Sequence, residues 1–412
     1  MPNLILNIDR PAYGGVSIGR HGGKIVLIRG AVLPGETVEV TNVNEKKDYF
    51  SASVSKILKP SADRIDPLCR HFGECGGCHF QHIPYSLQVQ LKEEILRNCL
   101  RRQANIEVAL SRSIINATAW NYRLRGQFKI SRGKTGFYRA NSRDVVSIDS
   151  CPLMGETLNR QLHRLKDLIH GLIIKEIYIT SDDCSVALIK SPTHIRTGEA
   201  WNKGAAEFLE SGFQGLCIET GDNRVLRYGK SYVTLGLGHL TYTVSPMSFL
   251  QSNWKMNTSV VTCIADTLGP LKGRRVLDLY AGAGNFSLPL AAHAEVVAVE
   301  ENQFAVEDGK RNVKINQINN YKFIRSSAER FRPDNGFDVL LLDPPRKGLA
   351  KQVMNTVLSL LPEKIVYVSC NPATFARDLK KLHSRYSIDS VRMIDFFPQT
   401  YHIEALAFLR LR

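Results

Sequence analysis

The sequence predicts a multi-domain α/β protein, with a small β-barrel at the N-terminus, a central α+β domain and a C-terminal doubly wound parallel sheet. Three observations predict this architecture. The chain has 412 residues, more than one ordinary domain holds. Its first part contains short alternating apolar runs between turn dipeptides, and from Gly273 onward strands, a glycine loop and helices alternate. We place the domains at 1–58, 59–250 and 251–412.

The N-terminal runs "KIVLIRG", "ETVEVTNV" and "YFSASVSKIL" alternate apolar and polar residues, as half-buried strands do. The dipeptides "GG" and "PG" separate them. Short strands between such turns predict the β-barrel. Lys59-Pro60-Ser61 is the expected boundary.

The stretch "CRHFGECGGCHFQH" follows that boundary, and in it Cys69, Cys75 and Cys78 have the spacing C-x5-C-x2-C. The chain start, "MPNLILNIDRP", does not resemble a signal peptide, and no apolar run is long enough to span a membrane, so we expect a cytoplasmic protein. In that compartment cysteines serve thiolate chemistry or metal binding before disulfides. The spacing predicts a metal site and leaves structural zinc and an iron–sulfur cluster both open.

The formal net charge of +15 predicts a polyanionic partner. Between Arg97 and Arg143, eleven Lys or Arg stand against one acid, Glu107, and aromatic residues are interleaved with them. This mixture neutralises phosphates and stacks on bases, so we expect RNA, with a solvated basic face as the alternative. The candidate RNA-binding residues are Arg123, Arg125, Lys129, Arg132, Phe137 and Arg139.

The rest of the central region predicts one helix followed by strands. "YSLQVQLKEEILRNCLRR" places Leu87, Leu91, Ile95 and Leu96 on one helical face. "EIYIT", "SVALIK" and "YVTLGLGHLTYTV" have the composition of strands.

The run "RRVLDLYAGAGNFSLPLAAHAEVVAVEEN" predicts a strand ending at Tyr280, a loop with Gly282 and Gly284, a helix, and a second strand ending at Glu300. A G-x-G loop with an acid about 20 residues further on is typical of an adenosine cofactor whose ribose donates to the acid. Ser287 replaces the third glycine of the dinucleotide pattern. This favours S-adenosylmethionine over NAD, and a purely structural loop is a third alternative.

Two later strands end in reactive residues. In "LLDPPRKGL" two prolines stop the strand and expose Asp343 and Arg346. In "VYVSCNPATFARDL" Cys370 ends a strand just before a helix that begins near Pro372. A thiol near a helix N-terminus and cations is expected to have a lowered pKa and to act as a nucleophile, while an inert core cysteine is the alternative.

Together these motifs resemble the RNA uracil-5-methyltransferase family, in particular its iron–sulfur branch acting on ribosomal RNA. The resemblance covers nearly the whole chain in the family's order, through "YGGVSIGRHGGKIVLIRGAVLPGETVEV", "CRHFGECGGCHFQH", "YRLRGQFKI", "SFLQSN", "LDLYAGAGNFSLPLA", "LLDPPRKG", "SCNPATFARDL" and "FPQTYHIEAL". It implies a TRAM-like (OB-like) N-terminal barrel and a Rossmann-like class I methyltransferase at the C-terminus.

The resemblance also implies roles for single residues. Cys370 would add to C6 of a uracil, which makes C5 nucleophilic toward the methyl group of S-adenosylmethionine. Glu404 matches the family's base for the C5 proton, and we expect Phe396 and Phe397 to raise its pKa by desolvation, with His402 as the rival base. The residues implied in cofactor binding are Gln251, Tyr280, Gly282, Gly284, Glu300 and Asp343, of which Asp343 has the uracil as its alternative partner.

For the metal site, the resemblance adds Cys151 in "DSCPLMG" as fourth ligand and implies a [4Fe–4S] cluster rather than zinc. Methyl transfer contains no redox step. We therefore expect an architectural cluster that ties 69–78 to Cys151 across the basic segment, with His71, His79 and His82 packed around it.

The expected activity is S-adenosylmethionine-dependent methylation of a flipped-out uridine in RNA, with 23S rRNA as the substrate. A tRNA m5U54 methyltransferase and a non-catalytic RNA-binding or ribosome-assembly factor are the alternatives. The "DPPR" turn disfavours N6-adenine or C5-cytosine methylation, because amino-group methylation uses an amide-bearing "NPPY"-type stretch. We expect a monomer with no obligate protein partner and no membrane association.

Overall fold

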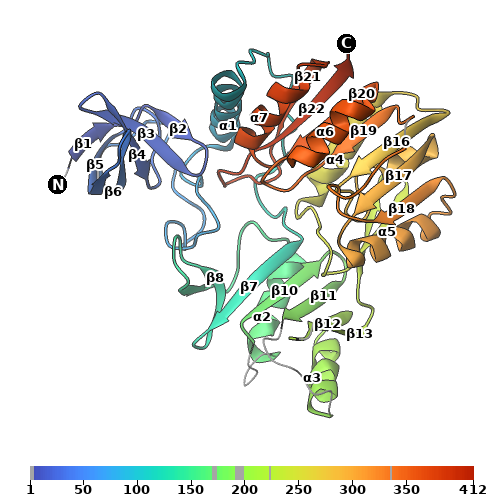
Figure 1. Cartoon of the computed structure of the whole chain (residues 1–412). Helices are drawn as coiled ribbons and strands as arrows, with labels where there is room; N and C mark the ends of the chain where they lie inside the picture. The colour runs from blue at the N-terminus through green and yellow to red at the C-terminus, as the bar shows by residue number, and fades with distance from the viewer. Residues whose placement is uncertain (1–3, 169–173, 191–198, 222–223, 335) are drawn as a thin grey trace.

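The computed structural model describes residues 4–168, 174–190, 199–221, 224–334 and 336–412. Three β-sheets follow one another along the described chain, and a two-stranded hairpin lies between the second and the third. Figure 1 shows the N-terminal sheet and the C-terminal sheet side by side, with the central sheet below them.

The N-terminal sheet has six strands in the order β1-β5-β6-β4-β3-β2. They are β1 (Leu4–Asn7), β2 (Arg10–Ala12), β3 (Val16–His21), β4 (Lys24–Arg29), β5 (Thr37–Glu45) and β6 (Tyr49–Lys59). The sheet curls until β1 meets β3, since a Cβ on Gly19 would lie 2.8 Å from the carbonyl oxygen of Asn7. Apolar side chains of β4 and β5 form its core: Val26, Ile28, Val38 and Val40. The predicted strands are confirmed, and the TRAM-like assignment of this curled sheet stays a prediction.

The segment 60–84, which holds the cysteine-rich stretch, consists of turns and one isolated bridge. Helix α1 (Tyr85–Cys99) follows and continues into a π-helical turn, η1 (Leu100–Ala104). Ile95 and Leu96, on the predicted apolar face, are buried in a core shared with α7 (Pro372–Leu382). In Figure 1, α1 accordingly lies beside α7.

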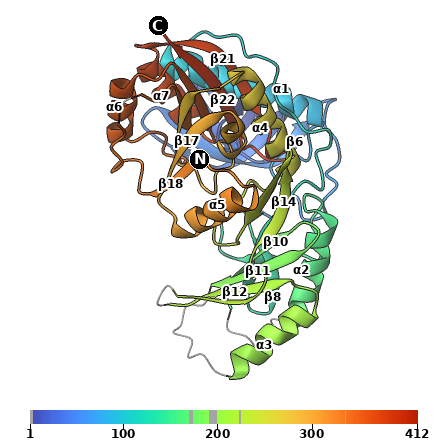
Figure 2. The same cartoon turned by 90° about the vertical axis from the view of Figure 1, so that its right-hand side faces the viewer.

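The central sheet has seven strands in the order β13-β12-β11-β10-β7-β8-β9. They are β7 (Arg125–Ser131), β8 (Lys134–Tyr138), β9 (Val145–Ser147), β10 (Glu176–Ser181), β11 (Ser185–Lys190), β12 (Gly215–Glu219) and β13 (Val225–Gly229). Helices α2 (Glu156–Leu168) and α3 (Glu199–Glu210) pack on this sheet around a separate apolar core. Figure 2 shows this α+β unit extending away from the other two sheets.

A hairpin, β14 (Val233–Leu237) and β15 (Leu240–Val244), packs with the C-terminal sheet and with α4 (Trp254–Leu268). Tyr242 lies against Trp254, with ring centroids 5.1 Å apart. Asn312 Oδ1, on α5 (Gln303–Ile315), accepts from the Thr243 N–H at 2.7 Å. Both α1 and this hairpin precede residue 250 and contribute to the C-terminal cores, while the proposed domain boundaries themselves stay predictions.

The C-terminal sheet has seven strands in the order β18-β17-β16-β19-β20-β22-β21. They are β16 (Arg274–Leu279), β17 (Ala294–Glu300), β18 (Tyr321–Arg325), β19 (Val339–Leu342), β20 (Lys364–Ser369), β21 (Tyr386–Ile394) and β22 (Glu404–Leu411). One face packs on α4 and the hairpin, and the other on α1, α6 (Lys351–Leu360) and α7. The doubly wound sheet is therefore present. Its last two strands are antiparallel to their neighbours, because the loop 395–403 joins them directly without a crossover helix.

The predicted helix after the glycine loop is wrong. In its place is a single 3-10 turn, η2 (Leu288–Ala292). Pro289 lacks the N–H that an α-helix starting at Asn285 would need there, and β17 begins at Ala294. The loop is therefore held by side chains rather than by a following α-helix.

The longest described helices, α1 and α4, have 15 residues each. Across the described ranges, none of the helices combines the length and hydropathy that crossing a bilayer requires.

Candidate active site

Three predicted site residues stand at the ends of neighbouring strands in the C-terminal sheet. Asp343 follows β19, Cys370 follows β20 and Glu404 begins β22. Ser369 pairs with Ala405, and Cys370 and Glu404 are the next residues of these two chains toward the same edge of the sheet. The two side chains are close enough for the charge of Glu404 to act on the Cys370 thiol.

Cys370 is half-buried, and the N-terminal sheet reaches it. The Tyr13 hydroxyl, from the turn between β2 and β3, donates to the Cys370 carbonyl at 3.4 Å. Beside it, a Cβ on Gly15 would lie only 2.7 Å from the ring of Tyr401. The turn of the first sheet therefore packs directly against the last one at the candidate nucleophile.

The predicted lowering of the Cys370 pKa is wrong. The pKa of this thiol is raised to about 11, mainly by burial and also by the charges of Glu404 and Asp343, while Arg346 opposes the increase. Helix α7 does begin at Pro372 as predicted. Its N-terminus does not outweigh burial beside two carboxyl groups, so the thiol is protonated at neutral pH.

Glu404 is buried and has a pKa raised to about 8. Burial is the main cause, the charges of Asp343 and Asp395 add to it, and Arg346 opposes it. The direction agrees with the prediction. Burial also raises the pKa of Asp343 to about 7. Two acids with pKa values near neutrality thus flank the thiol.

His402, the rival base, is half-buried, and burial lowers its pKa to about 4, with Arg346 as the next cause. Its ring packs against Phe397 and Tyr401, at centroid distances of 5.7 and 4.5 Å. This packing makes His402 part of an aromatic cluster. Glu404 is the better placed proton acceptor, because its charge acts directly on Cys370.

The predicted cofactor loop turns through three residues with positive φ: Tyr280 (66°), Gly282 (56°) and Gly284 (87°). The Gly282 N–H donates to Glu300 Oε2 at 2.9 Å, and the Asn302 N–H donates to Oε1 at 2.7 Å. Backbone groups thus orient the Glu300 carboxylate at the end of β17. Each oxygen retains a lone pair for a hydroxyl donor, as a ribose would supply.

A buried polar group under this loop was missed by the sequence prediction. Ser287 Oγ donates to Asp278 Oδ2 and lies 2.6 Å from the Tyr321 hydroxyl. Burial raises the pKa of Asp278 to about 8, while the Ser287 hydrogen bond lowers it. Ser287 therefore ties the loop to β16 and β18. The available signal was the single acid in the otherwise apolar end of the strand "RRVLDL".

Gln251 is buried just before α4, and among the described residues its Oε1 has no hydrogen-bond partner. A buried amide oxygen requires a donor, which the ammonium group of an amino-acid-like cofactor supplies. Together with the glycine loop and the oriented Glu300, this acceptor fits S-adenosylmethionine, which carries both a ribose and an ammonium group.

The four predicted metal ligands, Cys69, Cys75, Cys78 and Cys151, line one cavity of about 820 Å³. The pKa of Cys78 is raised to about 12, mainly by burial and also by the other three cysteines, while a hydrogen bond with Gln81 lowers it. Burial likewise raises the pKa of Cys151, and so do Cys69 and Cys75. The fold thus brings both segments together. Within the described ranges, no three His, Cys, Asp or Glu side chains surround a single-ion position.

Two amides that the sequence prediction missed hold these cysteines. Gln81 Oε1 accepts from the Cys69 N–H at 3.0 Å. Asn159 Oδ1 accepts from the Cys151 N–H at 2.8 Å, and Asn159 Nδ2 donates to the Cys151 carbonyl at 3.1 Å. No pattern in the sequence distinguishes these amides from other polar residues.

The cavity also gathers four of the predicted RNA-binding residues: Arg123, Lys129, Phe137 and Arg139. Lys129 pairs with Glu176, and Arg139 pairs with Glu74 at 2.6 Å. Arg132 lies apart from them, exposed in the turn between β7 and β8. The cavity therefore joins the cysteines to a basic and aromatic wall.

Arg125 has a structural position instead of the predicted RNA contact. Its guanidinium donates to Thr180 Oγ1 at 2.8 Å and to the carbonyls of Ser248 and Ser245 at 2.6 and 3.2 Å. Burial lowers its pKa to about 10. These contacts link β7 and β10 to the turn before Gln251, and we replace the RNA-binding prediction for Arg125 by this role.

Comparison with known proteins extends over the whole chain. Residues 84–335 and 333–412 match the family described as tRNA (Uracil-5-)-methyltransferase. The chain is 35% identical over 425 residues to an "Uncharacterized RNA methyltransferase" of Aquifex aeolicus, covering 99% of each chain. It is 33% identical over 418 residues to the 23S rRNA (uracil(1939)-C(5))-methyltransferase RlmD of Aeromonas salmonicida, covering 97% of this chain and 94% of that protein.

Its structure is similar to that of the Pyrococcus abyssi tRNA (uracil-54, C5)-methyltransferase in complex with S-adenosyl-L-homocysteine. The TM-score is 0.76 at 26% identity, covering 98% of this chain and 100% of that one. The family match spans both cofactor loop and strand-end residues, and the relatives are similar along their whole length. The chain belongs to the tRNA (Uracil-5-)-methyltransferase family.

Proposed function

We propose that this protein transfers a methyl group from S-adenosylmethionine to C5 of a uridine in RNA. The observation that carries the proposal is that Cys370 and Glu404 lie close together at the ends of the paired strands β20 and β22. The loop of Gly282 and Glu300 lies at the same edge of this sheet. A nucleophile and a base at one sheet edge can add to a pyrimidine ring and later release it, and membership of the family supports this chemistry.

Cys370 activates the target carbon. The uracil carbonyls withdraw electron density, so C5 is a poor nucleophile by itself. When Cys370 Sγ bonds to C6, the C5=C6 electron pair moves into an enolate and C5 becomes electron-rich. The thiol first loses its proton, which its raised pKa opposes and Arg346 favours.

S-adenosylmethionine, held at the glycine loop, would supply the electrophilic methyl group and would leave as S-adenosylhomocysteine. Glu300 would accept from the ribose hydroxyls, and Gln251 Oε1 from the ammonium group. Asp343 follows the strand next to Cys370, where it would orient either the uracil N3–H or that same ammonium. The protein thus holds donor and acceptor carbons together at one sheet edge.

Glu404 completes the reaction. After methyl transfer, C5 carries a methyl group and a proton. The ionised Glu404 takes that proton, the C–H electron pair forms the C5=C6 double bond, and the C6–S pair returns to Cys370 as thiolate. A pKa of about 8 suits a base that must be regenerated near neutral pH.

For the substrate we propose 23S rRNA, which the name of the Aeromonas salmonicida relative states. The similar Pyrococcus abyssi structure is named for a tRNA uracil, so tRNA is the alternative substrate. Arg123, Lys129 and Arg139 would contact phosphates, and the target uridine would be flipped out to reach Cys370. The curled N-terminal sheet, as a TRAM-like barrel, would extend this RNA-binding surface. We propose that the protein works as a monomer in the cytoplasm.

We also propose that Cys69, Cys75, Cys78 and Cys151 bind a [4Fe–4S] cluster. Four part-buried thiols from two separate segments line one cavity, and four thiolates are the ligand set of such clusters. Binding there would join the cysteine turns to the segment before α2. The proposed role is architectural, because the methylation steps above require no electron transfer.

The experiment is to map 5-methyluridine in rRNA and tRNA from a strain lacking the gene, and to assay purified protein with 23S rRNA fragments and tRNA transcripts. Loss of one 5-methyluridine from 23S rRNA, with transfer to the matching fragment, supports the proposal. Loss of 5-methyluridine from the tRNA T-loop instead would identify tRNA as the substrate. An unchanged map without transfer in the assay contradicts a catalytic function and favours a non-catalytic RNA-binding factor.

A further inference from the structure

The loop 395–403 leads from β21 directly to Glu404, the proposed base. Each of its first five backbone carbonyls accepts a hydrogen bond from a residue outside the C-terminal sheet. The pairs are Asn116 Nδ2 to Asp395 O (2.6 Å), Asn253 Nδ2 to Phe396 O (3.1 Å), Lys92 Nζ to Phe397 O (3.0 Å), Tyr122 Oη to Pro398 O (3.0 Å), and the N–H groups of His79 and Phe80 to Gln399 O (2.8 and 3.0 Å). The path of this loop is therefore set by side chains and backbone far away in the sequence.

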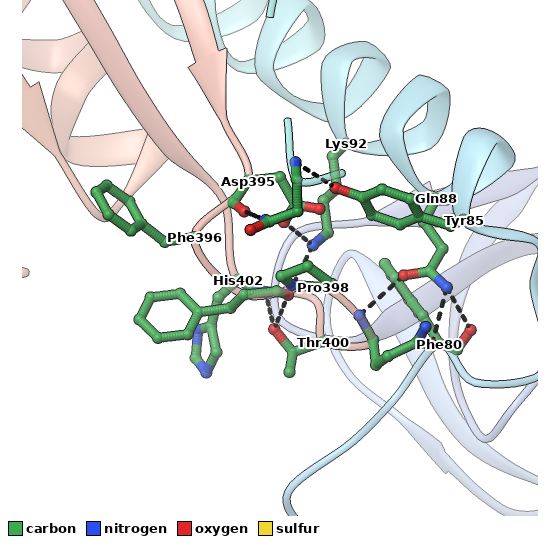
Figure 3. A network of polar contacts seen from close by, with 12 residues as sticks. Phe80, Tyr85, Gln88, Lys92, Asp395, Phe396, Pro398, Thr400 and His402 are labelled. Atoms are coloured by element: carbon green, nitrogen blue, oxygen red, sulfur yellow. Dashed lines mark hydrogen bonds and ion pairs between the residues drawn. The ribbon is translucent and has the colours of Figure 1, made fainter. Parts of the chain in front are cut away.

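Lys92 differs from the other donors because it brings a charge into a site without solvent. The side chains of Lys92 and Asp395 are both 0% exposed, and Nζ lies 2.7 Å from Asp395 Oδ1. Figure 3 shows Lys92 descending from α1 onto the loop, next to Tyr85 and Asp395. Burial lowers the pKa of Lys92, and the charge of Asp395 raises it.

Gln88, one helical turn before Lys92, joins the same loop to the cysteine-rich segment. Its Nε2 donates to the Phe80 and Ile83 carbonyls at 3.1 and 2.8 Å and to Gln399 Oε1 at 2.9 Å. Its Oε1 accepts from the Gln399 N–H at 2.9 Å. Two successive turns of α1 thus hold the first half of the loop, through Lys92 at residues 395 and 397 and through Gln88 at residue 399 (Figure 3).

A fully buried ion pair is a weak source of stability, because desolvation of both charges offsets their attraction. Apolar side chains could fill this space at similar stability. The ion pair instead fixes the path of the loop, because the Lys92 ammonium group binds both the Asp395 side chain and the Phe397 carbonyl. The charge of Asp395 also contributes to the raised pKa of Glu404, so the position of Asp395 affects the proton affinity of the proposed base.

We infer that Lys92 is a positioning residue for the removal of the C5 proton, since it sets the direction in which the loop delivers Glu404 to Cys370. The inference rests on the proposed function, because it takes Glu404 as the base. In this step Glu404 gains the C5 proton, the C5–H electron pair forms C5=C6, and the C6–S pair leaves with Cys370. A displaced base slows this step alone, so the methylated covalent adduct accumulates.

The test uses the full-length Lys92→Met variant with RNA tritiated at uracil C5 and S-adenosylmethionine carrying a radiocarbon methyl group. We expect tritium release to slow about 10²-fold, as a misplaced catalytic group does. Radiocarbon should build up in a protein–RNA complex that survives SDS, while KM for RNA stays within about twofold of wild type. Glu404→Gln provides the trapped reference state. Gln90→Met, at an exposed position of α1, is the matched control with wild-type rates.

Lys92→Met leaves Asp395 buried without its cation, which alone can destabilise the fold. The variant Lys92→Met with Asp395→Asn removes both charges. We expect it to melt at the wild-type temperature and still accumulate adduct. Tritium release at the wild-type rate from this folded variant overturns the inference and leaves the proposed function intact. Absence of any adduct in both the wild type and Glu404→Gln overturns the proposed function itself.

Discussion

Cys370 and Glu404 lie close together because Ser369 of β20 pairs with Ala405 of β22 in antiparallel register, and each is the next residue toward the same edge of the sheet. β20 also runs parallel to β19, which ends just before Asp343. A parallel strand presents its carboxyl end at the ligand-binding edge, whereas the antiparallel β22 presents its first residue there. The reversal made by the loop 395–403 is what places a base beside the nucleophile.

Replacing Cys370 with Ala is expected to abolish both methyl transfer and covalent trapping. Fluorine at C5 cannot be removed by a base, so 5-fluorouridine RNA with S-adenosylmethionine should leave wild-type enzyme attached to RNA. The measurement is the fraction of protein shifted on a denaturing gel. Cys263→Ala, on α4, should trap as the wild type does. A shifted band with Cys370→Ala is incompatible with the covalent mechanism.

Proton removal is expected to accelerate as the pH rises, because the pKa of Glu404 is raised to about 8 and only its ionised form is a base. Single-turnover tritium release should show an inflection near this value, which Glu404→Gln abolishes. The contribution of Glu404 to the stability of the folded protein falls over the same rise in pH. A raised folded-state pKa contributes stability below the unfolded-state value, about 4.3, and this contribution is lost as the pH rises through the folded-state value. A release rate that falls with pH would contradict the assignment.

Arg346→Met is expected to raise the pKa of Cys370 still further, because Arg346 is the cation that lowers it. The pH dependence of Cys370 alkylation, followed by mass spectrometry of its peptide, measures this shift. Adduct formation should slow in parallel. Lys347→Met, the exposed neighbour, is the control for loss of a nearby positive charge. Equal shifts in both variants would remove the specific role of Arg346.

Cys78→Ser is expected to lose the metal centre and to melt at a lower temperature. Anaerobically purified wild type should contain about four iron atoms and four labile sulfides per chain if the cluster is [4Fe–4S]. Cys217→Ser, buried in β12 away from the cavity, should keep both. Stoichiometric zinc without sulfide in the wild type would replace the cluster proposal by a zinc site.

Arg125→Ala and Arg132→Ala are expected to separate stability from RNA binding. Arg125 donates to three internal oxygens, so its loss should lower the melting temperature. Arg132 is exposed, so its loss should leave the melting temperature unchanged and reduce the salt slope of RNA binding by about one. Paired thermal melts and filter-binding titrations measure both effects, and a reversed pattern would restore Arg125 to the RNA interface.

Local patterns predicted what depends on local physics. Apolar runs predicted the strands of the C-terminal sheet, and glycines predicted a loop that needs positive φ at Gly282 and Gly284. The raised pKa of Glu404 was predicted because burial follows from its apolar surroundings. The sequence could not show which cations find internal partners, and Arg125 was therefore misassigned.

The pKa of Cys370 was mispredicted for a related reason. Its helix N-terminus is local, whereas Asp343 and Glu404 reach it only through strand pairing. The absent helix after the glycine loop is a different case, because Pro289 is a local signal that the prediction overlooked. The contacts of Ser287 with Asp278 and Tyr321, which hold that loop, do join distant segments. Contacts between distant segments were beyond a pattern-based prediction.

The turn carrying Tyr13 and Gly15 touches the Cys370 carbonyl and the Tyr401 ring. The first structural unit of the chain is consequently part of the reactive centre and not a detachable accessory. A chimaera that exchanges N-terminal units between relatives would therefore replace one wall of that centre. Substitutions in the N-terminal sheet and in the C-terminal sheet are thereby coupled, since a change in either sheet must preserve the contacts of Tyr13 and Gly15 with Cys370 and Tyr401.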